Sequence, residues 1–272
     1  MPELPEVETV KNSLKNYVLN RKILKVDVLY KGIINYPSVK EFIEKITNQT
    51  ILDVKRRGKY LVFVLEDYNL ISHLKMEGKY FIKDKYEITK HDHVIFTLDN
   101  NKYLIYNDTR KFGKMYLINK EYDNNSPLNI LGLEPWDKEL TISYLKDKLN
   151  RNIAIKTLLL DQTIIVGIGN IYADEILFAS KIHPQSLAKN ISLDECKSIV
   201  EHSKNILKEA IAHKGTTVFS FKFDPNHTGN YQNFLKVHSR ENQECYVCKS
   251  KIIKIKVNGR GTYFCPNCQK VK

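Results

Sequence analysis

The 272-residue sequence lacks any apolar run that approaches the roughly 20 residues needed to cross a membrane. It also lacks low-complexity windows, and its 42% hydrophobic content is enough for ordinary globular cores. Its first nine residues are acidic and interrupted by prolines, whereas a secretory signal starts basic and continues apolar. These absences predict a cytoplasmic protein of one large or two modest domains, with no membrane partner.

Acidic residues are too few to balance the basic ones. The 31 Asp and Glu stand against 43 Lys and Arg, which gives a formal net charge of +12. This excess favours a nucleic acid partner over a membrane surface, because no basic amphipathic helix is evident. The segment from Lys236 to Lys272 alone holds nine basic residues and two acidic ones. A basic soluble protein without such a partner is the alternative.

Cysteine is scarce as well, but its placement is informative. Four of the five cysteines form the pairs Cys245/Cys248 and Cys265/Cys268, with sixteen residues between the pairs. Two such knuckles supply the four thiolates of a closed tetrahedral zinc site, so we expect one structural Zn²⁺ per chain. Two disulfides are the alternative, which a reduced cytoplasmic compartment disfavours. Cys196 lies at a core-facing position of a helical pattern and is expected to be buried and inert.

The periodicity of apolar residues divides the chain into three stretches. A helix near Pro5 is followed, from about Lys22 to Ile118, by short strand-like runs separated by turns, which indicates a sandwich or barrel. A boundary is expected at residues 124–135. Beyond it the pattern is helical, and Ser192 to Glu195 reads as the capping box of a long helix. A β-hairpin is predicted within Ile252 to Phe264.

Two features of the C-terminal half could bind a polyanion. Arg260 would stand at the tip of the predicted hairpin, where it either contacts DNA or is merely solvated. The turn Gly167-Ile168-Gly169-Asn170 leads into a helical pattern, and backbone amides at such a turn can bind phosphate. An ordinary turn between helices is the alternative. The absence of a preceding strand argues against a dinucleotide fold.

The N-terminus could supply a nucleophile. Removal of Met1 would leave Pro2 with a free secondary amine, and α-amines titrate near about pH 7.7–8.0. An uncharged amine can form an iminium with a sugar aldehyde carbon, as lysine does in Schiff-base enzymes. Glu3 and Glu6 could move protons nearby. The alternative is that this proline, like most N-terminal prolines, does nothing.

Seven motifs stand in a recognisable order along the whole chain: Met1–Thr9, Arg56–Leu61, Ser72–Gly78, Lys90–His93, Asn107–Gly113, Gly167–Tyr172 and Val257–Pro266. Together they resemble the bacterial formamidopyrimidine-DNA glycosylases, the Fpg or MutM family. The resemblance implies an α+β fold with an N-terminal β-sandwich flanked by helices at residues 1–130. A helix–two-turns–helix domain would follow at 135–235, with a lesion-covering loop at 216–231. A four-cysteine zinc-finger hairpin would occupy residues 236–272.

The resemblance also implies an activity in base-excision DNA repair. The enzyme would be a bifunctional DNA glycosylase and AP lyase that removes 8-oxoguanine and formamidopyrimidines from double-stranded DNA and acts at abasic sites. By similarity, Pro2 forms a Schiff base with the sugar and Glu3 acts as the acid that assists ring opening, with Glu6 in support. Lys59 and Arg260 would donate protons in the β- and δ-eliminations. The enzyme is expected to act as a monomer.

Two further sets of residues match DNA-contacting positions of the family. The target nucleotide must leave the base stack before it can react. The first set fills the gap that it leaves: Met76, Arg110 and Phe112. Without the family, Met76 and Phe112 would be taken as core residues. The second contacts the DNA backbone: His73, His91, Arg151 and Asn170.

Some positions depart from the family pattern. Thr109 stands where many members have proline, and His238-Ser239-Arg240 replaces a more usual Tyr-Gly-Arg. The covering loop is rich in phenylalanine between Phe219 and Asp224. The family's mode of base recognition therefore carries over to this chain less directly than its excision chemistry.

Three alternatives remain, the first a sister group of glycosylases and the other two from different classes of protein. An endonuclease VIII-like glycosylase for oxidised pyrimidines typically has glycine where Leu4 stands. A non-catalytic zinc-ribbon protein that binds damaged DNA would not need Pro2 with Glu3. A ribosomal or RNA-binding zinc protein would not be expected to carry Met76 and Phe112 in matching contexts.

Overall fold

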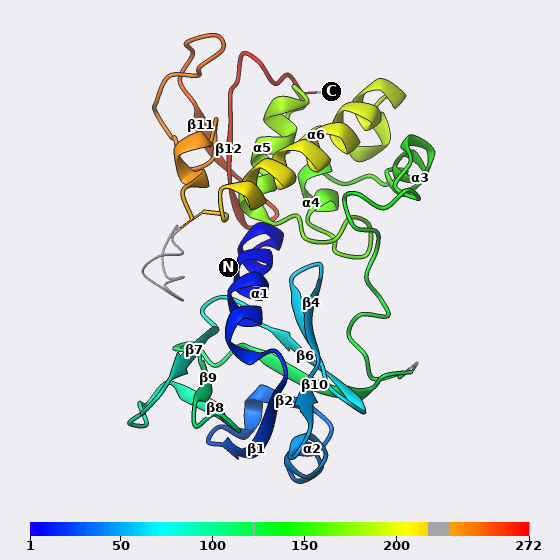
Figure 1. Ribbon diagram of the computed structural model, residues 1–272. Helices are drawn as coiled ribbons and strands as arrows, with labels where there is room; N and C mark the ends of the chain where they lie inside the picture. Colours follow the sequence, from blue (N-terminus) through cyan, green and yellow to red (C-terminus); the bar gives the residue numbers. More distant parts are fainter. Residues whose placement is uncertain (122, 217–228, 272) are drawn as a thin grey trace. The chain divides into compact units, whose positions relative to one another are not determined.

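The computed structural model of the chain describes residues 1–121, 123–216 and 229–271, and these fall into two compact units (Figure 1). Unit 1 contains residues 1–2 and 6–129. Unit 2 contains residues 3–5, 130–216 and 229–271. Most of the predicted covering loop at 216–231, including Phe219 to Asp224, lies outside the described residues.

Unit 1 contains two five-stranded sheets. One has the order β3 (Thr50–Ile51), β1 (Arg21–Val28), β8 (Asp92–Leu98), β9 (Tyr103–Asn107) and β7 (Lys79–Lys83). The other has the order β2 (Ile34–Tyr36), β10 (Lys114–Asn119), β6 (Tyr68–His73), β5 (Tyr60–Val64) and β4 (Asp53–Arg57). Apart from the parallel β2–β10 pair, neighbouring strands are antiparallel. The predicted β-sandwich is confirmed.

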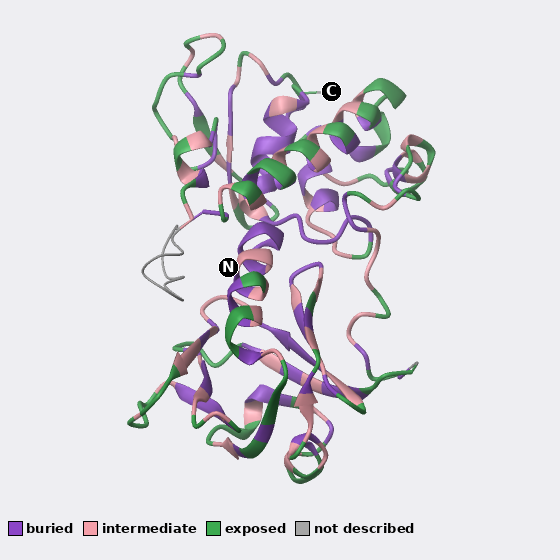
Figure 2. Ribbon diagram, viewed as in Figure 1, coloured by how far each residue is buried: buried purple, intermediate pink, exposed green. Residues whose placement is uncertain are grey.

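Helices complete the core of unit 1. Helix α1 (Leu4–Val18) directs Val7, Val10, Leu14 and Val18 into that core, because residues three or four apart share a helix face. Buried and more exposed residues both occur along this helix (Figure 2). The helix begins one residue before Pro5, where the sequence predicted a helix start. Helix α2 (Val39–Ile46) is capped by the hydroxyl of Ser38, and the 3₁₀ turn η1 (Lys31–Ile33) precedes β2.

Unit 2 is mainly helical. Its elements are α3 (Ile142–Lys148), α4 (Ile155–Leu159), α5 (Asn170–Ala179), α6 (Leu193–Ala212), the 3₁₀ turns η2 (Ala188–Asn190) and η3 (Tyr231–Phe234), and the hairpin strands β11 (Ile253–Val257) and β12 (Arg260–Phe264). The predicted capping box at Ser192 and Glu195 is present. Cys196 is fully buried in the core of this unit, as expected.

The zinc-segment hairpin forms where the sequence predicted it. Asn258 and Gly259 connect β11 to β12, and both have positive φ angles, 45° and 73°. Two such residues in succession are the requirement of the tight hairpin turn that Asn-Gly favours. The hairpin therefore places Arg260 directly after its turn.

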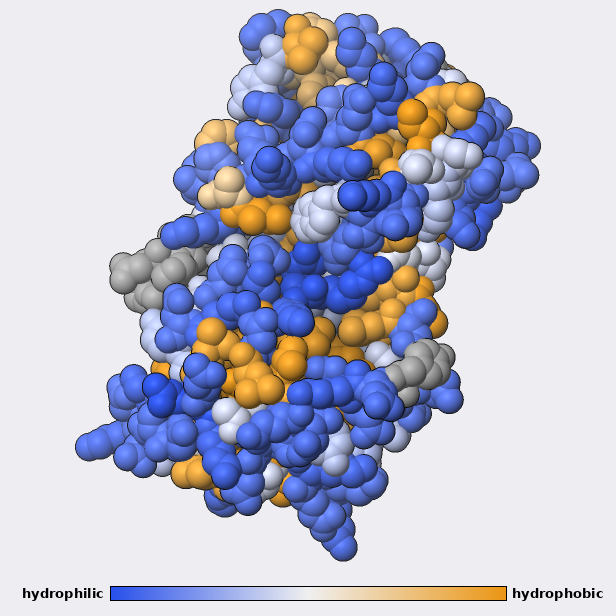
Figure 3. Space-filling model, turned by 45° about the vertical axis from the view of Figure 1, so that its right-hand side comes forward, coloured by the Kyte–Doolittle hydropathy of each residue, from blue (hydrophilic) through white to orange (hydrophobic). Residues whose placement is uncertain are grey.

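The surface of the molecule is largely hydrophilic on the face drawn in Figure 3, with hydrophobic residues gathered in smaller patches. Among the described helices, none is both long enough and apolar enough to cross a membrane.

Candidate functional site

The carboxylate of Glu3 occupies the N-terminus of α5. It accepts hydrogen bonds from the backbone amides of Gly169 at 2.8 Å, Ile171 at 2.9 Å and Tyr172 at 3.4 Å. A helix N-terminus leaves such amides unsatisfied and favours negative charge, and α5 has no side-chain cap from its own N-cap residue. Glu3, which is only 3% exposed, therefore takes the place that the sequence suggested for a phosphate.

The two glycines of the Gly-x-Gly turn make room for the N-terminal residues. A Cβ atom on Gly169 would lie 2.2 Å from Cδ of Glu3, far closer than atoms can approach. Gly167 has a φ of +90°, and a Cβ there would lie 2.3 Å from Cδ1 of Leu4. The amide of Leu4 also donates to the carbonyl of Gly167 at 3.1 Å. The turn thus anchors the residues that directly follow Pro2, which is itself half-buried.

The zinc hairpin is tied to the same helix. Arg260 is exposed, and its neighbour Gly261 accepts a hydrogen bond at its carbonyl from Nδ2 of Asn170, the first residue of α5 (2.9 Å). Asn170, assigned to phosphate contact by resemblance, therefore also bridges helix and hairpin. Glu3, Asn170 and Arg260 all belong to unit 2.

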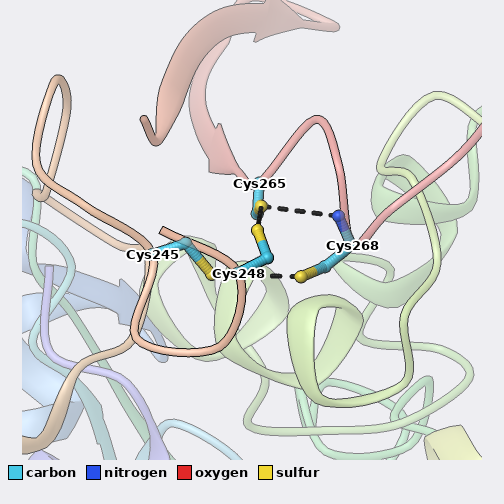
Figure 4. Close-up of side chains that lie close together, drawn as sticks. All are labelled: Cys245, Cys248, Cys265 and Cys268. Carbon is cyan, nitrogen blue, oxygen red and sulfur yellow. Dashed lines mark hydrogen bonds between the residues drawn. The ribbon is translucent and has the colours of Figure 1, made fainter. Parts of the chain in front are cut away.

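The four predicted metal ligands converge. The Sγ atoms of Cys245, Cys248, Cys265 and Cys268 all lie within 4.8 Å of one another and point toward a common centre (Figure 4). The Sγ atoms of Cys248 and Cys265 are 3.4 Å apart and those of Cys245 and Cys268 are 3.9 Å apart, too long for the about 2.05 Å of a disulfide bond. Four soft thiolates without an open position fit one structural zinc ion, so the predicted zinc site is confirmed.

Lys59 and His73 lie in unit 1. Lys59 is 6% exposed and follows Gly58, whose φ of 54° makes the tight turn between β4 and β5. His73 ends β6, with its ring 4.5 Å from that of Tyr60 in an edge-on contact. Nδ1 of His73 accepts the backbone amide of Lys75 at 2.9 Å, which leaves the proton on Nε2. His73 is thereby suited to donate a hydrogen bond without carrying charge.

We expect His73 to make the protein less stable in acid. Burial, with the positive charges of Lys75 and Lys59 nearby, lowers the pKa of His73 to about 3. The unfolded chain takes up this proton below its ordinary pKa of about 6.5, whereas the folded protein does not until about pH 3, so stability falls as the pH drops through 6.5. Between pH 7 and pH 5 this contributes a loss of ~2 kcal/mol in the free energy of unfolding. Urea unfolding of the wild type and of His73→Gln checks it, and parallel pH dependences in the two proteins would contradict it.

The loop between β9 and β10 is held rigidly by one carboxylate. Asp108 accepts the amides of Arg110 at 2.9 Å and Gly113 at 2.8 Å. The guanidinium of Arg110 stacks over the ring of Phe112 at 4.7 Å, and Phe112 remains 49% exposed. This exposure excludes the core interpretation of Phe112. Met76, in the turn between β6 and β7, is half-buried.

The remaining predicted residues lie in varied surroundings. His91 is half-buried directly before β8, and Glu6 is 7% exposed in the first turn of α1. Arg151 is exposed and pairs with Asp161 at 3.5 Å.

Sequence reasoning missed a group of buried ionisable residues in unit 2. Glu175 accepts the amides of Lys236 at 2.7 Å, Val237 at 2.9 Å and His238 at 2.8 Å, which anchors the chain where it enters the zinc segment. Burial raises the pKa of the Glu175 carboxyl, against the effect of these donors. The signal that could have revealed this role is the pair Asp174-Glu175 inside the otherwise apolar helix α5.

Comparison with known proteins gives matches along the whole chain. Family models of the formamidopyrimidine-DNA glycosylase N-terminal domain, its H2TH domain, and a zinc finger found in FPG and IleRS match residues 1–115, 131–222 and 242–271. The formamidopyrimidine-DNA glycosylase of Mycoplasma pneumoniae is 46% identical, with 99% of each chain covered. That of Oceanobacillus iheyensis is 44% identical, covering 100% of this chain and 99% of the relative.

Solved structures agree with these relatives. A Lactococcus lactis FPG mutant in complex with Fapy-dG containing DNA superposes with a TM-score of 0.92 at 37% identity, covering 99% of this chain and 100% of that one. The complex of Lactococcus lactis Fpg with an abasic site containing DNA gives 0.91 at 36% identity, covering 98% and 99%. The chain therefore belongs to the formamidopyrimidine-DNA glycosylase family, the zinc-finger DNA glycosylases of base-excision repair.

Proposed function

We propose that this chain removes oxidised purines, 8-oxoguanine and formamidopyrimidines, from double-stranded DNA and then cuts the strand at the abasic site. The observation that carries the proposal is Glu3, whose carboxylate is anchored on three amides of α5 directly after Pro2 in the chain. A buried, oriented carboxylate next to a candidate amine in the chain can transfer the protons that Schiff-base formation exchanges. The net charge of +12 suits a DNA partner.

In the proposed first step, the nitrogen of Pro2, freed by removal of Met1, attacks C1′ of the damaged nucleotide. The bond from C1′ to the base breaks, and the base leaves with the bonding electrons and takes up a proton. As its nitrogen bonds to C1′, Pro2 loses its proton to the Glu3 carboxylate, and Glu3 then acts as the acid that passes this proton to the sugar ring oxygen. Ring opening leaves an iminium between Pro2 and C1′. Because the nitrogen of Pro2 is a secondary amine, the iminium that it forms has no N–H proton to lose and retains its positive charge.

The iminium then promotes strand cleavage. It withdraws electrons and acidifies the C2′–H bond, so loss of that proton expels the 3′ phosphate in a β-elimination. A second, δ-elimination releases the 5′ phosphate. We assign the proton donor of the first elimination to Lys59 and that of the second to Arg260, and we place Glu6 in support.

DNA contacts complete the proposal. Phe112, which is exposed and stacked with Arg110, would enter the base stack when the target nucleotide leaves it. Met76 would fill the remaining gap. Backbone phosphates would be contacted by a second set: His73, His91, Arg151 and Asn170. We expect the enzyme to act as a monomer. Its domain boundaries are expected near residues 130 and 236.

Borohydride trapping on a duplex with one 8-oxoguanine opposite cytosine tests the proposal. We expect a covalent adduct that peptide mapping places on Pro2, which would also show that Met1 has been removed. Duplexes with a formamidopyrimidine or an oxidised pyrimidine define the substrate range. The pyrimidine belongs in the panel because a Lactococcus lactis FPG complex holds an oxidised pyrimidine containing DNA. Retained binding without adduct or strand cleavage would instead favour a non-catalytic protein that binds damaged DNA.

Gly169→Ala is expected to slow base excision by about 10²-fold, because the added Cβ would overlap Cδ of Glu3 and displace its carboxylate by roughly an ångström. Single-turnover kinetics on an 8-oxoguanine duplex measure this effect. Gly32→Ala is the matched control, since the atoms nearest to its Cβ belong to the exposed ring of Tyr30, which can move. Equal rates for Gly169→Ala and the control would show that the position of Glu3 does not matter.

A further inference from the structure

A buried ionic cluster joins the helices of unit 2 to its zinc hairpin. Nζ of Lys156, on α4, lies 2.7 Å from Oδ1 of Asp174, on α5, and both side chains are completely buried. The other oxygen of Asp174 lies 2.7 Å from Nδ1 of His238. The ring of His238 also meets that of Tyr263 edge-on at 4.9 Å.

This cluster holds four consecutive residues of β12. Lys156 donates to the hydroxyl of Thr262 at 2.8 Å and to the carbonyl of Gly261 at 3.2 Å. The hydroxyl of Thr262 in turn donates to the carbonyl of Arg260 at 3.0 Å. The amide of Tyr263 donates to Asp174 at 3.2 Å. In the described part of the chain, β11 is the one strand that pairs with β12. The side chains of the cluster therefore provide hydrogen-bond partners for backbone groups on the other edge of β12.

Stability alone does not account for the cluster. Removing two charges from water costs several kcal/mol per ion, and an apolar pair of similar size is often equally stable. Burial lowers the pKa of Lys156, opposed by Asp174. A buried ion pair instead fixes the orientation of the groups bonded to it, because its hydrogen bonds form only in particular geometries. The charge of Glu3 raises the pKa of Lys156, and that of Arg260 lowers it.

We propose that Lys156, Asp174 and Thr262 are positioning residues that fix the backbone at Arg260 relative to the Glu3-capped end of α5. His238 completes the set by occupying the second oxygen of Asp174. This inference rests on the proposed role of Arg260 in the second elimination. In this proposal the zinc ion and the buried cluster have separate roles. The zinc ion stabilises the fold of the hairpin, and the cluster fixes its position.

The ratio of strand-cleavage products tests the proposal. On an abasic-site duplex, β-elimination alone leaves an unsaturated aldehyde at the 3′ end, whereas the second elimination leaves a phosphate. Thr262→Val keeps the size of the side chain and removes the hydroxyl that links Lys156 to Arg260. We expect it to slow the second elimination about 10-fold, since small misplacements of catalytic groups have effects of this order. Base excision and zinc content should remain near wild type.

Lys156→Met is the second variant, with a larger expected effect in the same direction. Ser203→Ala is the matched control, because Ser203 is a buried hydroxyl of α6 outside the cluster. In an Arg260→Ala background, Thr262→Val should have no further effect on the product ratio. If Arg260→Ala itself leaves the ratio unchanged, the assigned role of Arg260 fails and the inference with it. If Arg260→Ala changes the ratio but Thr262→Val does not, or if the two effects simply add, the positioning role alone is overturned.

Discussion

Replacing Glu3 by glutamine is expected to slow release of an oxidised purine by about 10²–10⁴-fold, the range associated with a positioned proton-transfer group. Both carboxylate oxygens of Glu3 accept backbone amides: one from Ile171, the other from Gly169 and Tyr172. In glutamine, one of the two oxygens is replaced by an NH₂ group, which is a donor and would face at least one of these backbone donors without forming a hydrogen bond. The substitution would also remove the negative charge at the α5 N-terminus. Single-turnover excision from an 8-oxoguanine duplex measures the loss.

Affinity for the damaged duplex should survive this substitution, because Glu3 is buried and carries no positive charge for phosphates. Glu8→Gln, on the helix that directly follows Glu3, provides the matched control, since Glu8 forms ion pairs with Lys11 and Arg56 instead of capping α5. We expect the control to retain excision. A parallel loss of binding and excision in Glu3→Gln would indicate that Glu3 serves the structure of the site and not the chemistry.

Loss of the zinc ion is expected to unfold the hairpin segment. Structural zinc in small finger modules contributes about 10 kcal/mol or more of apparent binding free energy, and the apolar cluster that this segment forms with Phe178 of α5 is small. Cys265→Ser, or a strong chelator, should therefore remove the metal, disorder Arg260 and weaken DNA binding. The salt dependence of binding should become shallower, by about one unit of slope for every phosphate that the hairpin no longer neutralises.

Metal analysis and fluorescence anisotropy at several salt concentrations measure these effects. Cys196→Ala is the control, because Cys196 is buried in the helical core and lies apart from the four ligands. It should lose some stability but keep its zinc. A zinc-free Cys265→Ser protein with unchanged DNA affinity would show that the metal is dispensable for the hairpin.

Local features of this protein could be predicted from the sequence alone. The zinc ligands followed from the spacing of Cys245, Cys248, Cys265 and Cys268, because each knuckle brings two thiolates onto one turn. The capping box at Ser192 and the hairpin turn at Asn258 depend on neighbouring residues, which the sequence displays directly. Short strand-like runs indicated a sandwich or barrel for the same reason. The order of the motifs indicated the family, and the family implied the β-sandwich.

Long-range partners were decided only by the tertiary structure. The amides near Gly169 looked free to bind phosphate, yet they hold Glu3 from 166 residues away. The pairing of Lys156 with the β12 strand, 106 residues further on at Thr262, left no periodic signal either. Periodicity reports which face of a helix or strand is buried, but it does not report which polar groups meet there. The physical reason is that buried hydrogen bonds are satisfied by whichever partner the packed chain brings within about 3 Å, and that depends on the whole fold.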